Sequence, residues 1–177
     1  ADQAAELTHY LLWPDFTSQW PVYQTPDPSA FMGPERVIHA WGIPALNTLI
    51  LLSSGVTITI AHWGVVKERW SQAILFQSLT ILLALLFLGA QAYEYWLAHT
   101  HDGLKLSSGI YGNTFYMLTG FHGLHVFLGT VMLIVILGRL MARSFTAKEH
   151  FAFEAVAWYW HFVDVVWLAL FVFVYWI

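Results

Sequence analysis

Residues 70–97, WSQAILFQSLTILLALLFLGAQAYEYWL, decide the fold. No acidic or basic side chain occurs in this stretch before Glu94. A helix needs about 20 mostly apolar residues to cross the hydrocarbon core of a bilayer, and this stretch is longer than that. The stretch therefore predicts a membrane-spanning helix.

Three further segments, residues 43–66, 111–140 and 151–177, meet the same criterion. The whole chain has 58% hydrophobic and 10% charged residues, whereas soluble domains have about 25% charged residues. A chain with so little charge cannot cover itself with a hydrated surface. We therefore predict an all-α, multi-pass transmembrane bundle of four spanning helices over residues 43–177. The absence of cysteine excludes disulfides and thiolate metal sites.

Residues 1–42 are rich in Pro and Trp, with Trp13-Pro14 and Trp20-Pro21 as examples. We expect this segment to be an ordered surface loop with two aromatic anchors. Its first residues contain neither a basic stretch nor an apolar core, so we do not expect a signal peptide there.

Basic residues predict the orientation. Lys67 and Arg69 lie between the first and second predicted helices, and Arg139, Arg143 and Lys148 flank the link between the third and fourth. Consecutive spanning helices alternate in direction, so both links face the same side. Cytoplasmic loops carry the excess of Lys and Arg. The links are therefore predicted to be cytoplasmic, and the segment of residues 1–42 and the C-terminus are predicted to face the periplasm.

The same end of the bundle is a candidate for binding phospholipid headgroups. Lys and Arg near a membrane surface attract anionic lipids, and Trp favours the interface. The candidate residues are Trp63, Lys67, Arg69, Trp70, Arg139 and Arg143.

Several polar side chains fall inside the predicted spans. A charged group at the centre of a spanning helix costs at least about 2.5–3.5 kcal/mol on insertion scales, so each one needs a partner. These candidate residues are Asn47, Glu94, His122, His125, Glu154, His161 and Asp164.

Three interpretations of these residues compete. They could form a metal or haem site, a proton relay, or a buried hydrogen-bond network that holds helices together. The last span offers only His161 to a haem, and Glu154 is followed three residues later by Ala157 where a di-iron bundle has His. Small residues such as Gly120 and Gly129 allow close helix packing. The sequence therefore favours the structural network. We expect no catalytic residue and no metal ligand in this chain.

Four motifs resemble subunit III of the cytochrome c oxidases, in particular the bacterial type. They are PALNT at 44–48, QAYEY at 91–95, FYMLTGFHGLHV at 115–126 and HFAFEAVAWYWHFVDVVW at 150–167. They occur in the family's order, and the resemblance as a whole covers nearly the whole chain. The family has seven helices, and this sequence resembles helices four to seven, its C-terminal portion.

The resemblance implies a non-catalytic subunit of a proton-translocating oxidoreductase that reduces oxygen to water. It implies that haem and copper reside on partner subunits and that no cofactor is held by this chain. The implied partners are oxidase subunit I as the main contact, subunit II, structural phospholipid, and cytochrome c acting on the complex, with no nucleic acid. The implied roles are support of proton uptake, stability of the complex and lipid binding. The implied location is a bacterial inner membrane.

Alternatives are subunit III of a quinol oxidase, a stand-alone membrane transporter and a haem cytochrome. Related quinol oxidases share the His-Gly-Leu-His core of residues 122–125. A transporter would show broken helices or inverted repeats, and no repeat is visible in this sequence.

Overall fold

The computed structural model describes residues 41–100 and 109–176. The predicted loop segment of residues 1–42 lies outside them, apart from Trp41 and Gly42. Helix α2 spans Ile43–Val66, α3 Trp70–Thr100, α4 Gly109–Met141 and α5 Phe151–Leu170. Helix α5 continues as a π-helix, η1, over Phe171–Trp176. The described residues thus form helices joined by short links, which confirms the predicted all-α class.

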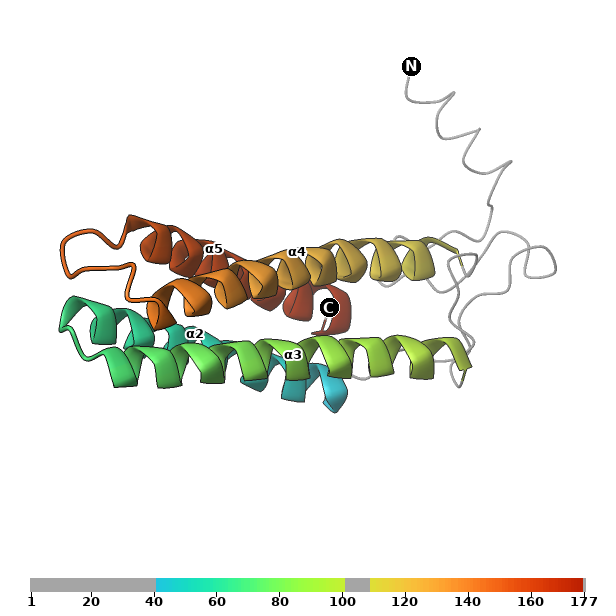
Figure 1. The fold of residues 1–177 in the computed structure, drawn as a ribbon. Coiled ribbons are helices and arrows are strands. Elements are labelled where there is room, and N and C mark those ends of the chain that lie inside the picture. The colour runs from blue at the N-terminus through green and yellow to red at the C-terminus, as the bar shows by residue number, and fades with distance from the viewer. Residues whose placement is uncertain (1–40, 101–108, 177) are drawn as a thin grey trace, which may run out of the picture.

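Four of these helices are long and apolar enough to cross a membrane. Helix α3 continues to Thr100 and α4 begins at Gly109, while α5 ends at Leu170, where η1 follows. Figure 1 shows the helices lying side by side, with both described links at one end of the bundle. This arrangement confirms that the two basic links share an end.

The helices pack as a ring. Contacts join α2 to α3, α3 to α4, α4 to α5, and α5 back to α2. Buried alanines and glycines let neighbouring backbones approach closely; at Gly64, for example, an added Cβ would lie 2.9 Å from the backbone nitrogen of Ala73. Large aromatic side chains, among them Phe87, Trp160 and Trp167, fill the centre of the ring.

The outer surface is apolar as well. Leu49, Leu75, Val135, Trp158 and Val165 are each more than half exposed. A helix that is hydrophobic all round is typical of a membrane span. The exposed leucines and valines therefore mark the surface that faces acyl chains or other spanning helices.

Both helices that enter the basic links end in the same way. The amide of Arg69 donates to Gly64 O and that of Glu68 to Val65 O, while Ser144 and Arg143 repeat this pattern at the end of α4. This is the Schellman arrangement, which requires a left-handed residue after the helix. Glu68 (φ 56°) and Arg143 (φ 54°) take that conformation without being glycine. The links are consequently tight and position their basic side chains.

The π-helix at the end of α5 changes which side chains face inward. A π-helix turns less per residue than an α-helix, because its hydrogen bonds span five residues. Val174 and Tyr175 are both buried there. The ring of Tyr175 lies 6.2 Å from that of Trp167 and 5.8 Å from that of Phe115, centroid to centroid. The π-helix thus keeps Tyr175 on the inner face of the bundle.

Gly129 provides a test of the α4–α5 packing. A Cβ at this position would lie 2.9 Å from two carbons of the buried Trp160 ring and 3.1 Å from Tyr159. Overpacking costs about 1–3 kcal/mol, so Gly129→Ala should lower the thermal unfolding temperature of the purified protein. Gly138, also on α4, has nothing within 4 Å of its added Cβ. Gly138→Ala is the matched control and should leave the unfolding temperature unchanged or raise it. Equal effects of the two substitutions would contradict the packing described here.

Candidate functional site

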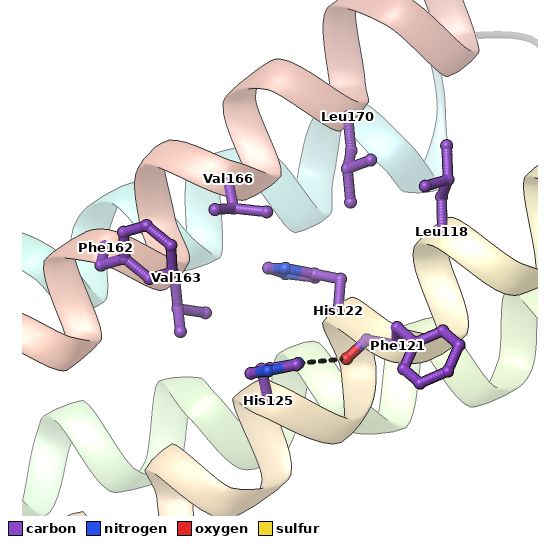
Figure 2. Close-up of a pocket in the computed structure, with 8 residues that line it drawn as sticks. All are labelled: Leu118, Phe121, His122, His125, Phe162, Val163, Val166 and Leu170. Carbon is purple, nitrogen blue, oxygen red and sulfur yellow. Dashed lines mark hydrogen bonds between the residues drawn. The ribbon is translucent and has the colours of Figure 1, made fainter.

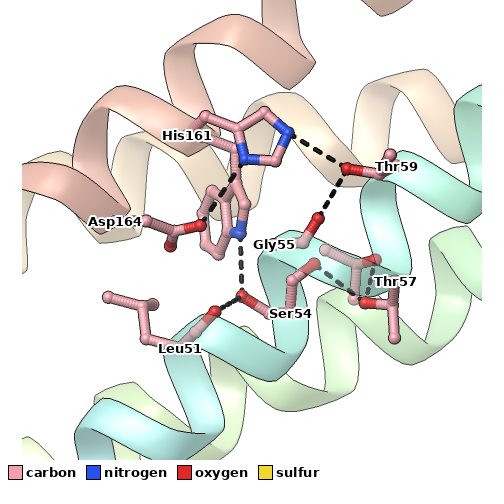
Figure 3. A network of polar contacts seen from close by, with 9 residues as sticks. Leu51, Ser54, Gly55, Thr57, Thr59, His161 and Asp164 are labelled. Carbon is pink, nitrogen blue, oxygen red and sulfur yellow. Dashed lines mark hydrogen bonds and ion pairs between the residues drawn. The ribbon is translucent and has the colours of Figure 1, made fainter.

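The contact between α2 and α5 contains two relays from a tryptophan to a hydroxyl and on to a carbonyl. Trp160 Nε1 donates to Ser54 Oγ (2.9 Å), and Ser54 Oγ donates to Leu51 O (2.6 Å). Trp167 Nε1 donates to Thr48 Oγ1 (3.0 Å), and Thr48 donates to Pro44 O (2.9 Å). Figure 3 shows the Ser54 relay. Each indole N–H therefore has an acceptor inside the apolar bundle.

His161 and Asp164 lie close together on α5. His161 Nδ1 is 3.8 Å from Asp164 Oδ2. His161 Nε2 lies 3.3 Å from Thr59 Oγ1 on α2. Asp164 is buried, and its Oδ2 occupies the space that a Cβ at Gly55 would need. The pair therefore connects α5 to α2.

A second polar cluster lies near the other end of the bundle, where α2, α3 and η1 meet. Asn47 Nδ2 donates weakly to Gln91 Oε1 at 3.5 Å. Asn47 and Glu94 are buried. The polar groups that face the Glu94 carboxyl are Gln91 and Tyr175. Neither carboxyl oxygen of Glu94 has a hydrogen-bond partner within the described ranges.

The contacts of α3 use further polar pairs. Thr57 and Thr80 share a hydrogen bond of 2.8 Å between α2 and α3. Gln77 Nε2 donates to Leu133 O (3.1 Å) between α3 and α4. Tyr95 OH and Thr119 Oγ1 are 2.6 Å apart across the same pair of helices. Every neighbouring pair around the ring is thus joined by at least one polar contact, since Tyr159 OH on α5 donates to His125 O on α4 (3.1 Å).

His122 and His125 differ from one another in surroundings. His122 is buried, with its ring 5.1 Å from Trp167 and 6.0 Å from Phe87, and its Nε2 has no partner among the described side chains. His125 is exposed, and its Nδ1 contacts Phe121 O (2.7 Å) on the same helix. The expectation that the His125 side chain joins the buried network is therefore wrong for the described part of the chain. Positions three apart differ by about 60° around the helix axis, so His122 faces inward while His125 lies at the edge of the same face, on the surface.

Figure 2 shows the surroundings of both imidazoles. They line a groove of about 310 Å³ between α4 and α5, together with apolar side chains. Because only His122 and His125 are polar in this lining, the groove suits an apolar occupant that also carries a group able to contact an imidazole.

Glu154 is partly buried. It shares a helix face with His161 and Asp164 but lies nearer the basic links, beside His62 of α2 and His150. One ligand atom from each of His62, His150 and Glu154 lies within 4.8 Å of the others. His62 Nε2 and His150 Nδ1 are buried and lack hydrogen-bond partners among the described residues. Two imidazoles and a carboxylate are a ligand set that zinc accepts.

The candidate headgroup residues gather at the linked end of the bundle. Lys67, Arg69, Arg139 and Arg143 are exposed, Trp63 is exposed and Trp70 is half-buried. Three of the cations lie over aromatic rings: Lys67 over Trp63 (5.9 Å), Arg139 over Phe145 (4.5 Å) and Arg143 over Trp70 (5.5 Å). These contacts hold the positive charges beside the apolar surface of the helix ends.

Sequence reasoning assigned Ser54 only to a weakly polar face of the first span, with Asn47 and His62, and missed Thr57, Gln77 and Thr80. Four uncharged polar residues are fully or almost fully buried and form inter-helix bonds: Ser54, Thr57, Gln77 and Thr80. An uncharged polar residue gives little indication in the sequence that it will be buried. Their signal is spacing: Ser54 and Thr57, like Gln77 and Thr80, are three apart and so share a helix face. The tryptophans at 160 and 167 carried a second signal, since a buried indole N–H needs an acceptor.

The cluster at His62, His150 and Glu154 makes a direct prediction. If it holds a cation, micromolar Zn²⁺ should raise the thermal unfolding temperature of the purified protein, because a ligand that binds only the folded state stabilises it. His150→Ala should abolish that increase. His99 is exposed and lies at the far end of α3, so His99→Ala is the matched control and should keep it. An identical response of all three proteins to Zn²⁺ would exclude a specific site.

Comparison with known proteins agrees with this architecture. The family model described as "Cytochrome c oxidase subunit III" matches residues 20–177. Proteins named cytochrome c oxidase subunit 3 are similar: that of Chondrus crispus is 55% identical over 141 residues (80% of this chain, 50% of the relative), and that of Struthio camelus is 45% identical over 163 residues (92% and 57%). The chain spans about half the length of the curated relatives it matches. The chain belongs to the cytochrome c oxidase subunit III family.

Proposed function

We propose that this chain is the C-terminal, four-helix portion of a non-catalytic subunit III that supports a respiratory, proton-pumping cytochrome c oxidase. The proposal rests on one observation: the polar groups within the spanning helices join one helix to another. Ser54, Thr57, Gln77 and Asp164 contact neighbouring helices and do not converge on one substrate-sized polar site. That distribution suits a structural flank of a complex, with the haem and copper chemistry placed on partner subunits.

The proposed partners are oxidase subunit I as the main contact and subunit II, with cytochrome c as the electron donor to the complex. The outer faces of the helices carry large exposed apolar side chains, which can pack against spanning helices of a partner as well as against lipid. We place the bundle in a bacterial inner membrane, with the two basic links in the cytoplasm and the C-terminus at the periplasmic side.

The proposed contribution is mechanical and electrostatic. A ring of helices joined by hydrogen bonds in a water-free medium is stiff, because each broken bond leaves an unsatisfied polar group. Such a flank restricts water and helix motion beside a neighbouring proton-uptake route. It thereby sustains proton uptake and the stability of the complex.

The proposed lipid contact lies at the basic links. Lys67 and Arg143 place positive charge over the exposed ring of Trp63 and the half-buried ring of Trp70. Arg139 lies over Phe145, and Arg69 is exposed on the first link. Anionic phospholipid headgroups are attracted to such a surface by about 1 kcal/mol per basic residue.

Purification of the native complex tests the proposed assembly. An affinity tag on this chain should recover haem- and copper-bearing subunits in fixed ratio, with oxygen consumption driven by reduced cytochrome c. Recovery of the chain without a haem-bearing partner would contradict the proposal. Oxidation of a quinol in place of cytochrome c would reassign the chain to a quinol oxidase.

The lipid contact is tested by charge removal. Arg139→Gln combined with Arg143→Gln should reduce the anionic phospholipid that co-purifies with the complex, measured by mass spectrometry. Lys148→Gln is the control, because Lys148 is exposed on the same link and is not one of the candidate headgroup residues. Unchanged lipid in the double variant would remove the basic links from the proposal.

A further inference from the structure

Among the acidic, basic and histidine side chains of α2 and α5, His161 and Asp164 lie farthest from the helix ends. Gly55 and Thr59 lie opposite it, near the middle of α2. Figure 3 shows the His161 ring between Thr59 and Asp164, with one ring nitrogen directed at each. The pair therefore lies where neither water nor lipid headgroups are at hand to compensate a charge.

The hydroxyl of Thr59 decides which nitrogen of His161 carries a proton. Thr59 Oγ1 donates to Gly55 O at 2.9 Å. A hydroxyl has one hydrogen, so its oxygen can only accept a bond from a second partner. His161 Nε2, at 3.3 Å, consequently faces a lone pair and acts as the donor.

The other nitrogen then lacks a proton unless the pair holds a second one. His161 Nδ1 is 3.8 Å from Asp164 Oδ2. In a neutral imidazole protonated at Nε2, Nδ1 is an acceptor, and a carboxylate oxygen is an acceptor as well. Two facing acceptors repel each other. One proton between them removes the repulsion, whether it resides on the imidazole or on the carboxyl.

The surroundings point to the same proton count. Neither α2 nor α5 contains a Lys or Arg, so no cation on these two helices offsets a negative pair. Asp164 is buried, and its Oδ1 lacks a partner within the described residues. The groove beside the pair, about 620 Å³, is lined mainly by apolar side chains, among them Leu52, Val56, Ile60 and Leu168. A net charge of −1 is costly there, whereas an uncharged pair is not.

We propose that His161 and Asp164 form a proton-binding site at mid-depth, with Thr59 as the positioning residue. The pair holds two protons in all: one on Nε2, donated in a hydrogen bond to Thr59, and one on either Nδ1 or the Asp164 carboxyl. The proton comes from water during assembly, and the pair as a whole is uncharged. Gly55 leaves the room that Asp164 Oδ2 occupies. The proposed function requires only that His161 and Asp164 contact another helix; this inference adds that they bind a proton. It does not depend on which subunits surround the chain.

Nuclear magnetic resonance of the native complex in lipid, with ¹⁵N-histidine and ¹³C-aspartate labels, measures the proton count. His161→Gln and Asp164→Asn identify the signals by their loss; the wild-type spectrum itself is the test. The expected result is a protonated Nε2, together with either a protonated Nδ1 or a carboxylic-acid carbon at Asp164. A bare Nε2 with a protonated Nδ1, or a protonated Nε2 beside a bare Nδ1 and an ionised Asp164, would overturn the proposal.

A matched pair of variants tests the role of Thr59. Thr59→Ser keeps the hydroxyl and should leave the Nε2 signal of His161 in place. Thr59→Val keeps the shape but removes the acceptor, and it should shift that signal away from its hydrogen-bonded position. The same shift in both variants, or in neither, would contradict a donor bond from Nε2 to Thr59.

Discussion

Polar groups inside a bilayer have no water with which to form hydrogen bonds, and the hydrogen bonding of this bundle follows from that constraint. The indoles of Trp160 and Trp167 find acceptors in Ser54 and Thr48, whose own hydrogens go to carbonyls of α2. Each hydroxyl thus serves as acceptor for another helix and as donor within its own. The same double use recurs at Thr59, which contacts both Gly55 and His161. Association of these helices needs such contacts, because lipid tails compete for every apolar surface.

Close packing makes these short bonds geometrically accessible. Gly129 faces the ring of Trp160, Gly64 faces the backbone of Ala73, and Gly55 faces the carboxyl of Asp164. Each glycine lies where a neighbouring helix approaches too closely for a Cβ. Stiffness of the bundle therefore has two sources, small residues that allow contact and polar groups that become unsatisfied if the contact opens. A stiff flank of this kind fits the supporting role proposed for the subunit.

Much of this architecture was predictable from the sequence, because apolar runs and basic links are local features. The spans, the shared end of the two links and the closeness of His161 to Asp164 required only hydropathy, charge and helical spacing. Helix rotation is not local. Which of His122 and His125 faces inward depends on how α4 packs against α3 and α5, and the sequence-based expectation failed for His125. The pairing of Ser54 with Trp160, 106 residues apart, likewise depends on the axial register of two helices. No feature of the sequence of residues 171–176 predicted the π-helix that buries Tyr175.

The account rests on polar side chains that join helix to helix, and the Ser54–Trp160 contact between α2 and α5 represents it most directly. A double-mutant cycle of Ser54→Ala and Trp160→Phe, measured by reversible unfolding of the purified protein in mixed micelles, isolates the energy of that one contact. Inter-helix hydrogen bonds in membranes average about 0.6 kcal/mol and reach about 1.7 kcal/mol, and a coupling in this range is the predicted result. A coupling of zero would show that the two side chains do not stabilise one another, and it would contradict the central role given to these bonds.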